Sequence, residues 1–126
     1  MRSQDEAYLD EHGYTWSATE DRHFVNLIID EWAIPDGLTP STTSVLIRLP
    51  AGFNVSGPDM FWCDPPVTLP CGTEPHATHV RNEFAGRQWQ RWSRHIGNAW
   101  RPGVDNVATY LHYVAQSMTQ AGERAA

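Results

Sequence analysis

The sequence predicts an α+β domain in which an antiparallel meander sheet is packed by an N-terminal and a C-terminal helix. Two observations carry this prediction. Strand-like segments separated by tight turns fill the first half of the chain, and a strongly amphipathic helical pattern closes it. A length of 126 residues corresponds to a single domain, 1–126, with its core over about 5–118.

The first three elements have clear boundaries. Residues 5–12 are good helix formers closed by Gly13 and predict a short helix. Residues 23–34 are rich in Phe, Val, Ile and Leu, which is typical of a strand. Residues 43–50 alternate between two faces and stop at a proline, so they predict a half-buried strand.

The middle of the chain is less regular. Residues 59–62, "DMFW", predict a short strand held between prolines, and residues 70–82 predict a loop. Residues 82–95 carry three aromatic side chains at roughly helical spacing, interrupted by Gly86, and predict a helix.

The last element has the strongest pattern. Apolar residues recur every three or four positions and predict a helix over 103–119. Pro102 stands where an early helical proline is tolerated, and Asp105 suits the positive end of a helix. The tail over 121–126 is expected to fray.

Composition limits the classes of protein that the chain can represent. The mean hydropathy is negative and no apolar run approaches the length of a membrane span, so we expect a cytoplasmic protein that binds no membrane. Cys63 and Cys71 are expected to be free thiols, as is usual inside cells. All nine basic residues are arginine.

Charge is divided unevenly along the chain. Residues 1–64 carry a net charge of −8 and residues 65–126 carry +2, within a total of −6. Five arginines fall between positions 81 and 101, interleaved with three tryptophans. This mixture suits an acidic protein partner, a nucleic acid or simply a solvated face, and the overall negative charge favours the protein partner over nucleic acid.

Three segments together resemble one family. "LIRLPAGFNVSGPDMFW" (46–62) resembles the third and fourth strands of ubiquitin-conjugating enzymes, and "WRPGVDNVATYLHYVAQSM" (100–118) resembles the Trp-x-Pro and helix that follow the active-site loop there. With "WSRH" (92–95), these pieces are similar to the bacterial ubiquitin-conjugating-like (UBC-like) family E.

The resemblance implies a UBC-like fold and a carrier function. Such a carrier accepts the C-terminus of a ubiquitin-like protein from an activating enzyme and passes it on, with an isopeptidase encoded in the same operon. It implies no cofactor.

The chain departs from the eukaryotic pattern at the nucleophile. No cysteine follows Cys71 and no His-Pro-Asn motif exists, whereas Ser93 lies seven residues before Trp100. We therefore expect an oxyester on Ser93, with His95 as the base, because a serine hydroxyl needs a neighbouring base. Two kinds of group are expected to stabilise the oxyanion: an arginine (Arg91 or Arg94) and an asparagine (Asn82 or Asn98).

Several alternatives stay open. Ser93 can be an ordinary polar residue in a catalytically inactive binding module that presents Arg91, Arg94, Trp100 and Arg101 to a partner. Cys63 can be a buried hydrophobe or a nucleophile, and Cys71 an inert thiol or a displaced nucleophile. A zinc site made of Cys63, Cys71, His76 and His79 is disfavoured by the ligand spacing, so no metal is expected.

Two further features bear on transfer. Four tryptophans are expected to form the core and the wall of the site, where exclusion of water would protect an ester: Trp62, Trp89, Trp92 and Trp100. The absence of lysine either reflects an arginine-favouring genome or prevents a loaded carrier from modifying its own side chains.

Overall fold

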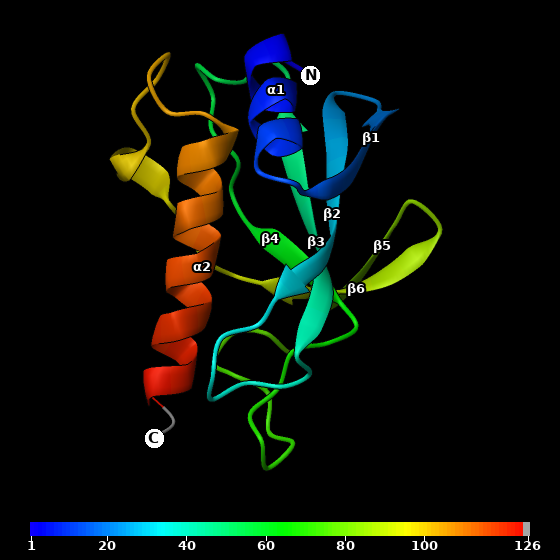
Figure 1. The fold of residues 1–126 in the computed structure, drawn as a ribbon, viewed down its shortest axis with the longest axis vertical. Coiled ribbons are helices and arrows are strands. Elements are labelled where there is room, and N and C mark those ends of the chain that lie inside the picture. The colour runs from blue at the N-terminus through cyan, green and yellow to red at the C-terminus, as the bar shows by residue number, and fades with distance from the viewer. Residues whose placement is uncertain (125–126) are drawn as a thin grey trace.

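The computed structural model describes residues 1–124, which form an antiparallel sheet and two α-helices. Its elements are α1 (Ser3–Glu11), β1 (Thr15–Asp21), β2 (Phe24–Ala33), β3 (Thr42–Pro50), β4 (Phe61–Asp64), β5 (Arg81–Phe84), β6 (Arg87–Trp92), the 3₁₀ turn η1 (Gly97–Ala99) and α2 (Val107–Arg124). The strand order is β1-β2-β3-β4-β6-β5. Figure 1 shows α2 alongside one face of the sheet and α1 at one end of it. The predicted fold class is therefore confirmed.

Most predicted elements are present with shifted ends. The helix over 5–12 and the strands over 23–34 and 43–50 correspond to α1, β2 and β3. The short strand expected over 59–62 begins two residues later, as β4. Within residues 1–124, no helix is both long and apolar enough to cross a membrane.

Strand β1 is an element that the sequence analysis missed. Its residues, "TWSATED", are exposed or half-buried throughout, so they give no apolar alternation. Seven backbone pairs with β2 hold it at the edge of the sheet. A polar edge strand of this kind depends on its neighbour for stability and not on its own burial.

The helix predicted over 82–95 is wrong, because this segment folds as the hairpin β5–β6. Ala85 and Gly86 form its turn with φ of 52° and 72°, and two positive values of this kind are typical of a type I′ hairpin loop. Trp89 and Trp92 are both fully buried but lie in different apolar clusters. Their spacing of three mimics a helix, whereas in a strand it places them on opposite faces.

The final helix starts later and ends later than predicted. Residues 101–105 form a turn in which Gly103 has φ of 75°, and α2 begins at Val107. Asn106 caps it, because its Oδ1 accepts a hydrogen bond from the Thr109 N–H at 3.1 Å. In the tail that was expected to fray, residues 121–124 belong to α2, and positions 125–126 lie outside the described residues.

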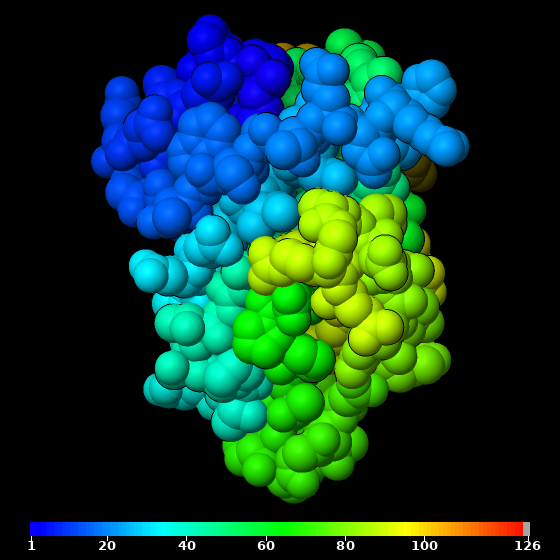
Figure 2. Space-filling model, turned by 90° about the vertical axis from the view of Figure 1, so that its right-hand side faces the viewer, coloured from blue at the N-terminus to red at the C-terminus, as the bar shows by residue number. Residues whose placement is uncertain are grey.

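Two apolar clusters lie on the two faces of the sheet. On the inner face, α2 packs its buried side chains against β2, β3, β4 and β6. On the opposite face, which we call the outer face, Leu46, Trp62 and Trp89 form a smaller cluster. Figure 2 shows the residues of the β5–β6 hairpin, in yellow-green, at the surface on that side of the molecule.

Candidate functional site

The segment between β6 and α2 is anchored by Trp100. Its ring packs against Phe53 with centroids 5.6 Å apart, and its Nε1 donates a hydrogen bond to the Asn54 carbonyl at 2.9 Å. The indole is 7% exposed. The loop after β3 and the loop before α2 are thus joined through one buried aromatic side chain.

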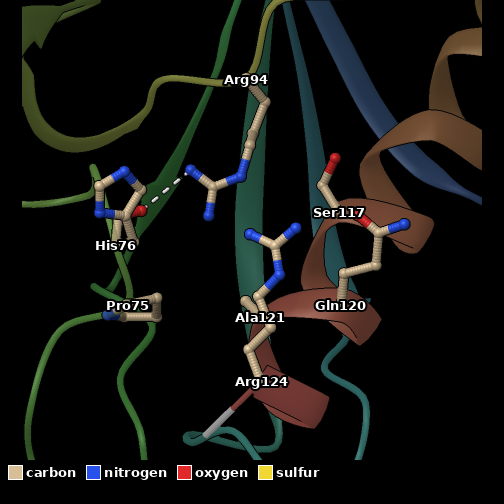
Figure 3. Close-up of a pocket in the computed structure, with 7 residues that line it drawn as sticks. All are labelled: Pro75, His76, Arg94, Ser117, Gln120, Ala121 and Arg124. Carbon is tan, nitrogen blue, oxygen red and sulfur yellow. Dashed lines mark hydrogen bonds between the residues drawn. The ribbon is translucent and has the colours of Figure 1, made fainter.

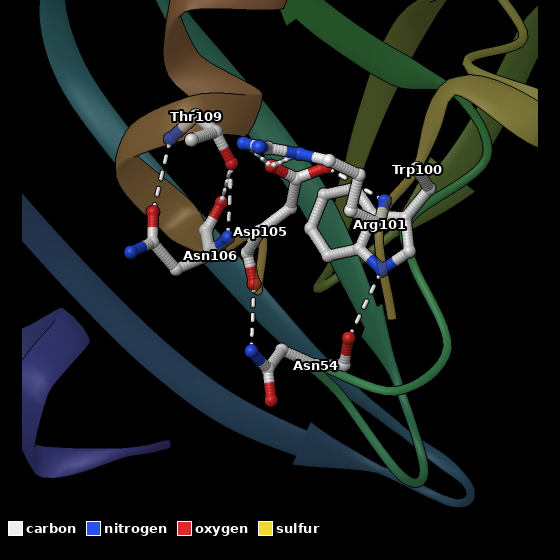
Figure 4. Close-up of polar contacts among 6 residues, drawn as sticks. All are labelled: Asn54, Trp100, Arg101, Asp105, Asn106 and Thr109. Carbon is white, nitrogen blue, oxygen red and sulfur yellow. Dashed lines mark hydrogen bonds and ion pairs between the residues drawn. The ribbon is translucent and has the colours of Figure 1, made fainter. Parts of the chain in front are cut away.

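A polar network continues from this anchor into the start of α2 (Figure 4). The Asn54 side-chain amide donates to the Asp105 carbonyl at 2.7 Å. The Asp105 carboxylate accepts from the backbone N–H and the guanidinium of Arg101, at 2.7 and 2.8 Å. These hydrogen bonds lower the pKa of Asp105 below its usual value.

Ser93 lies just after β6 and is half-buried. Its Oγ accepts a hydrogen bond from Arg91 Nε at 3.2 Å, and its backbone N–H donates to the Ala77 carbonyl. Arg91 pairs with Trp62 across the sheet, on the outer face. The Ser93 hydroxyl is therefore directed to the same side as Arg91, away from α2.

His95 makes its own separate contact. Its Nδ1 lies 2.7 Å from Asp59 Oδ1, and both side chains are more than half exposed. An imidazole held by a carboxylate at Nδ1 keeps Nε2 available for proton transfer. Asp59 was missed by the sequence analysis, because only the fold brings the residues before β4 next to those after β6.

Ser93 and His95 are not joined to each other. Among the hydrogen bonds of residues 1–124, none links the Ser93 hydroxyl to a histidine nitrogen. The contact expected from their spacing in the sequence is therefore not formed in this conformation.

The two candidate asparagines lie in different places. Asn98 lines a shallow groove of about 410 Å³ together with Asp59 and Trp100. Asn82 accepts a hydrogen bond from Trp62 Nε1 at 3.0 Å and pairs with Trp89. Trp89 is four residues before Ser93, so its partner Asn82 lies roughly 13 Å from the serine along the strand direction. Of the two asparagines, Asn98 is therefore the one near the His95–Asp59 pair, since it lines the same groove as Asp59.

The four residues expected to meet a partner do not form one continuous face. Arg91 points to the outer face, Arg94 lies beside α2, and Arg101 is bound to Asp105. Trp100 is buried beneath the loop that contains Asn54.

The two cysteines differ sharply. Burial raises the pKa of the Cys63 thiol far above its usual value. Cys71 is exposed, and hydrogen bonds with Thr73 lower its pKa. Within the part of the chain that the structure describes, no cluster of three or more His, Cys, Asp or Glu residues could hold a metal ion, so the four candidate zinc ligands are not gathered.

The sheet, the helix laid along its inner face and the anchored Trp-x-Pro turn define an α+β domain of the UBC-like class. A comparison with protein families matches prokaryotic E2 family E over residues 1–121, and the chain belongs to this family. No curated protein and no solved structure matches it significantly. Membership of an E2-like family indicates a carrier in ubiquitin-like conjugation. Proteins of this kind interact with a ubiquitin-like protein and with an activating enzyme.

Proposed function

We propose that this protein carries the C-terminal acyl group of a ubiquitin-like protein in a bacterial, cytoplasmic conjugation pathway. The observation that supports this most directly is the His95–Asp59 pair at the rim of the groove that Asn98 and Trp100 line. An imidazole oriented by a carboxylate can act as a general base. His95 lies two residues after Ser93, which carries the only hydroxyl group in residues 92–100, the segment that corresponds to the family's active-site loop.

The acyl carrier in this proposal is Ser93. Its Oγ attacks the activated carbonyl of the ubiquitin-like protein, forms an ester C–O bond and displaces the leaving group on the activating enzyme. The hydroxyl proton passes to Nε2 of His95, and the Asn98 amide donates to the oxyanion. Because the Ser93 hydroxyl contacts Arg91 and not His95, the segment after β6 must first bring the hydroxyl within reach of the imidazole.

The later transfer uses the same groups in reverse order. An acceptor amine attacks the ester carbonyl, an amide N–C bond forms and the ester C–O bond breaks. The amine proton passes to the His95 imidazole, which returns a proton to the Ser93 oxygen. The absence of lysine supports this role, since a loaded carrier has no side-chain amine of its own to modify. An associated isopeptidase would supply the opposite reaction.

Mass spectrometry after incubation with the activating enzyme and the ubiquitin-like protein tests the proposal. We expect a covalent adduct that survives a thiol reductant, because esters resist thiol exchange and thioesters do not. Ser93→Ala abolishes the adduct, and Asp59→Asn slows its formation by about tenfold or more. Ser17→Ala, at an exposed serine of β1, is the control and loads normally.

A catalytically inactive binding module is the second candidate. The contact between Ser93 and Arg91 favours it, because no hydrogen bond within residues 1–124 joins the Ser93 hydroxyl to a base. If the wild-type protein binds the activating enzyme but forms no covalent adduct, the protein is a binding module and the proposed carrier function is wrong. An adduct that a reductant removes and that Cys71→Ser prevents would instead identify Cys71 as the acyl carrier.

A further inference from the structure

A cavity beside the C-terminal half of α2 is lined by two guanidinium groups. Arg94 enters it from the segment after β6 and Arg124 from the last turn of α2, and Figure 3 shows the two guanidiniums directed toward the same space. His76 and Pro75 form one wall, and Ser117, Gln120 and Ala121 of α2 form the other. We call this cavity the arginine pocket.

Arg94 is held in place by contacts that leave part of it free. Its Nη1 donates to the His76 carbonyl at 3.0 Å, and its guanidinium carbon lies 5.0 Å from the centroid of the Trp92 ring. No hydrogen bond within residues 1–124 uses its Nε or Nη2. The guanidinium is therefore fixed in position with donors remaining for a ligand.

The pocket has positive charge without an acid to balance it. Neither Arg94 nor Arg124 forms an ion pair with an acidic side chain in the described chain, and no lining residue is acidic. Burial, together with the nearby charge of Arg124, lowers the pKa of Arg94. Two like charges that face one cavity repel each other, and a bound anion would remove that cost.

The size and the donors suit a phosphate group. The cavity measures about 60 Å³, a few times the ~10–15 Å³ that one water molecule needs. The Ser117 hydroxyl donates to the Tyr113 carbonyl, so the remaining donors are the two guanidiniums, the Gln120 amide and the His76 ring. The carbonyl end of α2 opposes an anion, but its partial charge is smaller than the two full charges of the arginines.

We propose that the arginine pocket binds a single phosphate group, free or as a phosphate monoester, through Arg94 and Arg124. Two positive charges match the charge of −1.5 to −2 that a phosphate monoester carries near neutral pH. This proposal does not depend on acyl transfer at Ser93, since it uses neither the serine hydroxyl nor the His95–Asp59 pair.

Nuclear magnetic resonance titration of the full chain with inorganic phosphate, at constant ionic strength set with chloride, tests the proposal. We expect saturable shifts of the Gln120 side-chain amide and of the His76 and Ala121 backbone amides. Arg94→Gln and Arg124→Gln each weaken binding by roughly tenfold or more, because each removes charge-assisted hydrogen bonds. Arg22→Gln, in the turn between β1 and β2, removes the same charge elsewhere and leaves the affinity unchanged.

Parallel titrations with O-phosphoserine and acetate identify the ligand. Tighter binding of O-phosphoserine than of inorganic phosphate assigns the pocket to a phosphate ester, and the reverse order assigns it to free phosphate. Shifts that fail to saturate, acetate binding as tight as phosphate, or affinities unchanged by Arg124→Gln would overturn the proposal. Arg124 is exposed at the end of α2, so its variant keeps the test valid even if Arg94→Gln fails to fold.

Discussion

The close approach of the Trp100 ring restricts position 57 to glycine. A Cβ placed on Gly57 would lie 2.5 to 2.9 Å from three carbon atoms of the indole ring, closer than real side chains approach. The same ring closes the groove beside the His95–Asp59 pair. The absence of a side chain at position 57 therefore sets how deeply Trp100 sits and how the candidate site is shaped.

Gly57→Ala is expected to destabilise the protein by about 1–3 kcal/mol, because the indole must move out of its buried position. Urea unfolding measures the change, and Ser56→Ala, at the exposed neighbouring residue, should stay within about 0.5 kcal/mol of the wild type. In a protein that already carries Trp100→Ala, Gly57→Ala should lower the free energy of unfolding by less than it does in the wild type. An equal cost in both backgrounds would contradict the contact as the cause.

At the same scale, sequence reasoning found individual residues but not their partners. The resemblance points to Ser93 and Trp100, and nearness in the sequence points to His95, whereas nothing points to Asp59, which lies 36 residues before His95. Similarly, nothing in the order of residues says that Ser93 meets Arg91. The extended backbone at the end of β6 places the two side chains on one side, where a helix would not.

Among the elements, the turn before α2 depends most on electrostatics. Arg101 and Asp105 close this turn, Asn106 caps the helix, and the Asp5 carboxylate accepts from the Val107 N–H at 3.2 Å. The two helices are thereby joined at the positive end of α2, where carboxylates are favoured. The sequence analysis placed Asp105 near this end correctly but began the helix four residues too early.

The lowered pKa of Asp105 predicts how stability responds to acid. A carboxyl group whose pKa is lower in the folded state stabilises the protein above its unfolded pKa, about 4, and this contribution disappears as pH falls through the folded pKa. Asp105→Asn should therefore be less stable than the wild type from pH 7 to 5, with a difference that narrows below about pH 4.

Urea unfolding at pH 7, 5, 4 and 3 checks this expectation. Arg101→Gln removes the main cause of the lowered pKa and should reduce the acid dependence in the same pH range. A difference between the wild type and Asp105→Asn that is as large at pH 3 as at pH 7 would show that the charge of Asp105 does not stabilise the turn.

At the scale of the whole molecule, hydrogen bonds from the Gln90 side chain of β6 hold the long loop after β4 against the sheet. Its fully buried amide accepts from the Val67 N–H at 2.8 Å and donates to the Val67 carbonyl at 2.9 Å. Its Oε1 also accepts from Trp92 Nε1 at 3.0 Å. One side chain thus satisfies three buried polar groups, two of which belong to the loop.

Gln90→Leu is expected to cost about 3 kcal/mol or more, because each buried group left without a partner costs about 1–3 kcal/mol. Urea unfolding measures the loss, and hydrogen exchange at the Val67 amide should become faster. Gln88→Leu is the matched control on the same strand, where an exposed side chain should change stability by no more than about 0.5 kcal/mol. A Gln90→Leu variant as stable as the wild type would contradict this role.

By itself, the sequence determined the fold class, the amphipathic C-terminal helix and the apolar strands β2 and β3, because periodic apolar side chains specify both a local structure and a buried face. Only the tertiary structure decided that "QWQRW" (88–92) is a strand with tryptophans on both faces, that polar β1 pairs at an edge, and that His95 meets Asp59. These features depend on long-range pairing, in which the partner supplies the hydrogen bonds or the burial that the segment lacks alone.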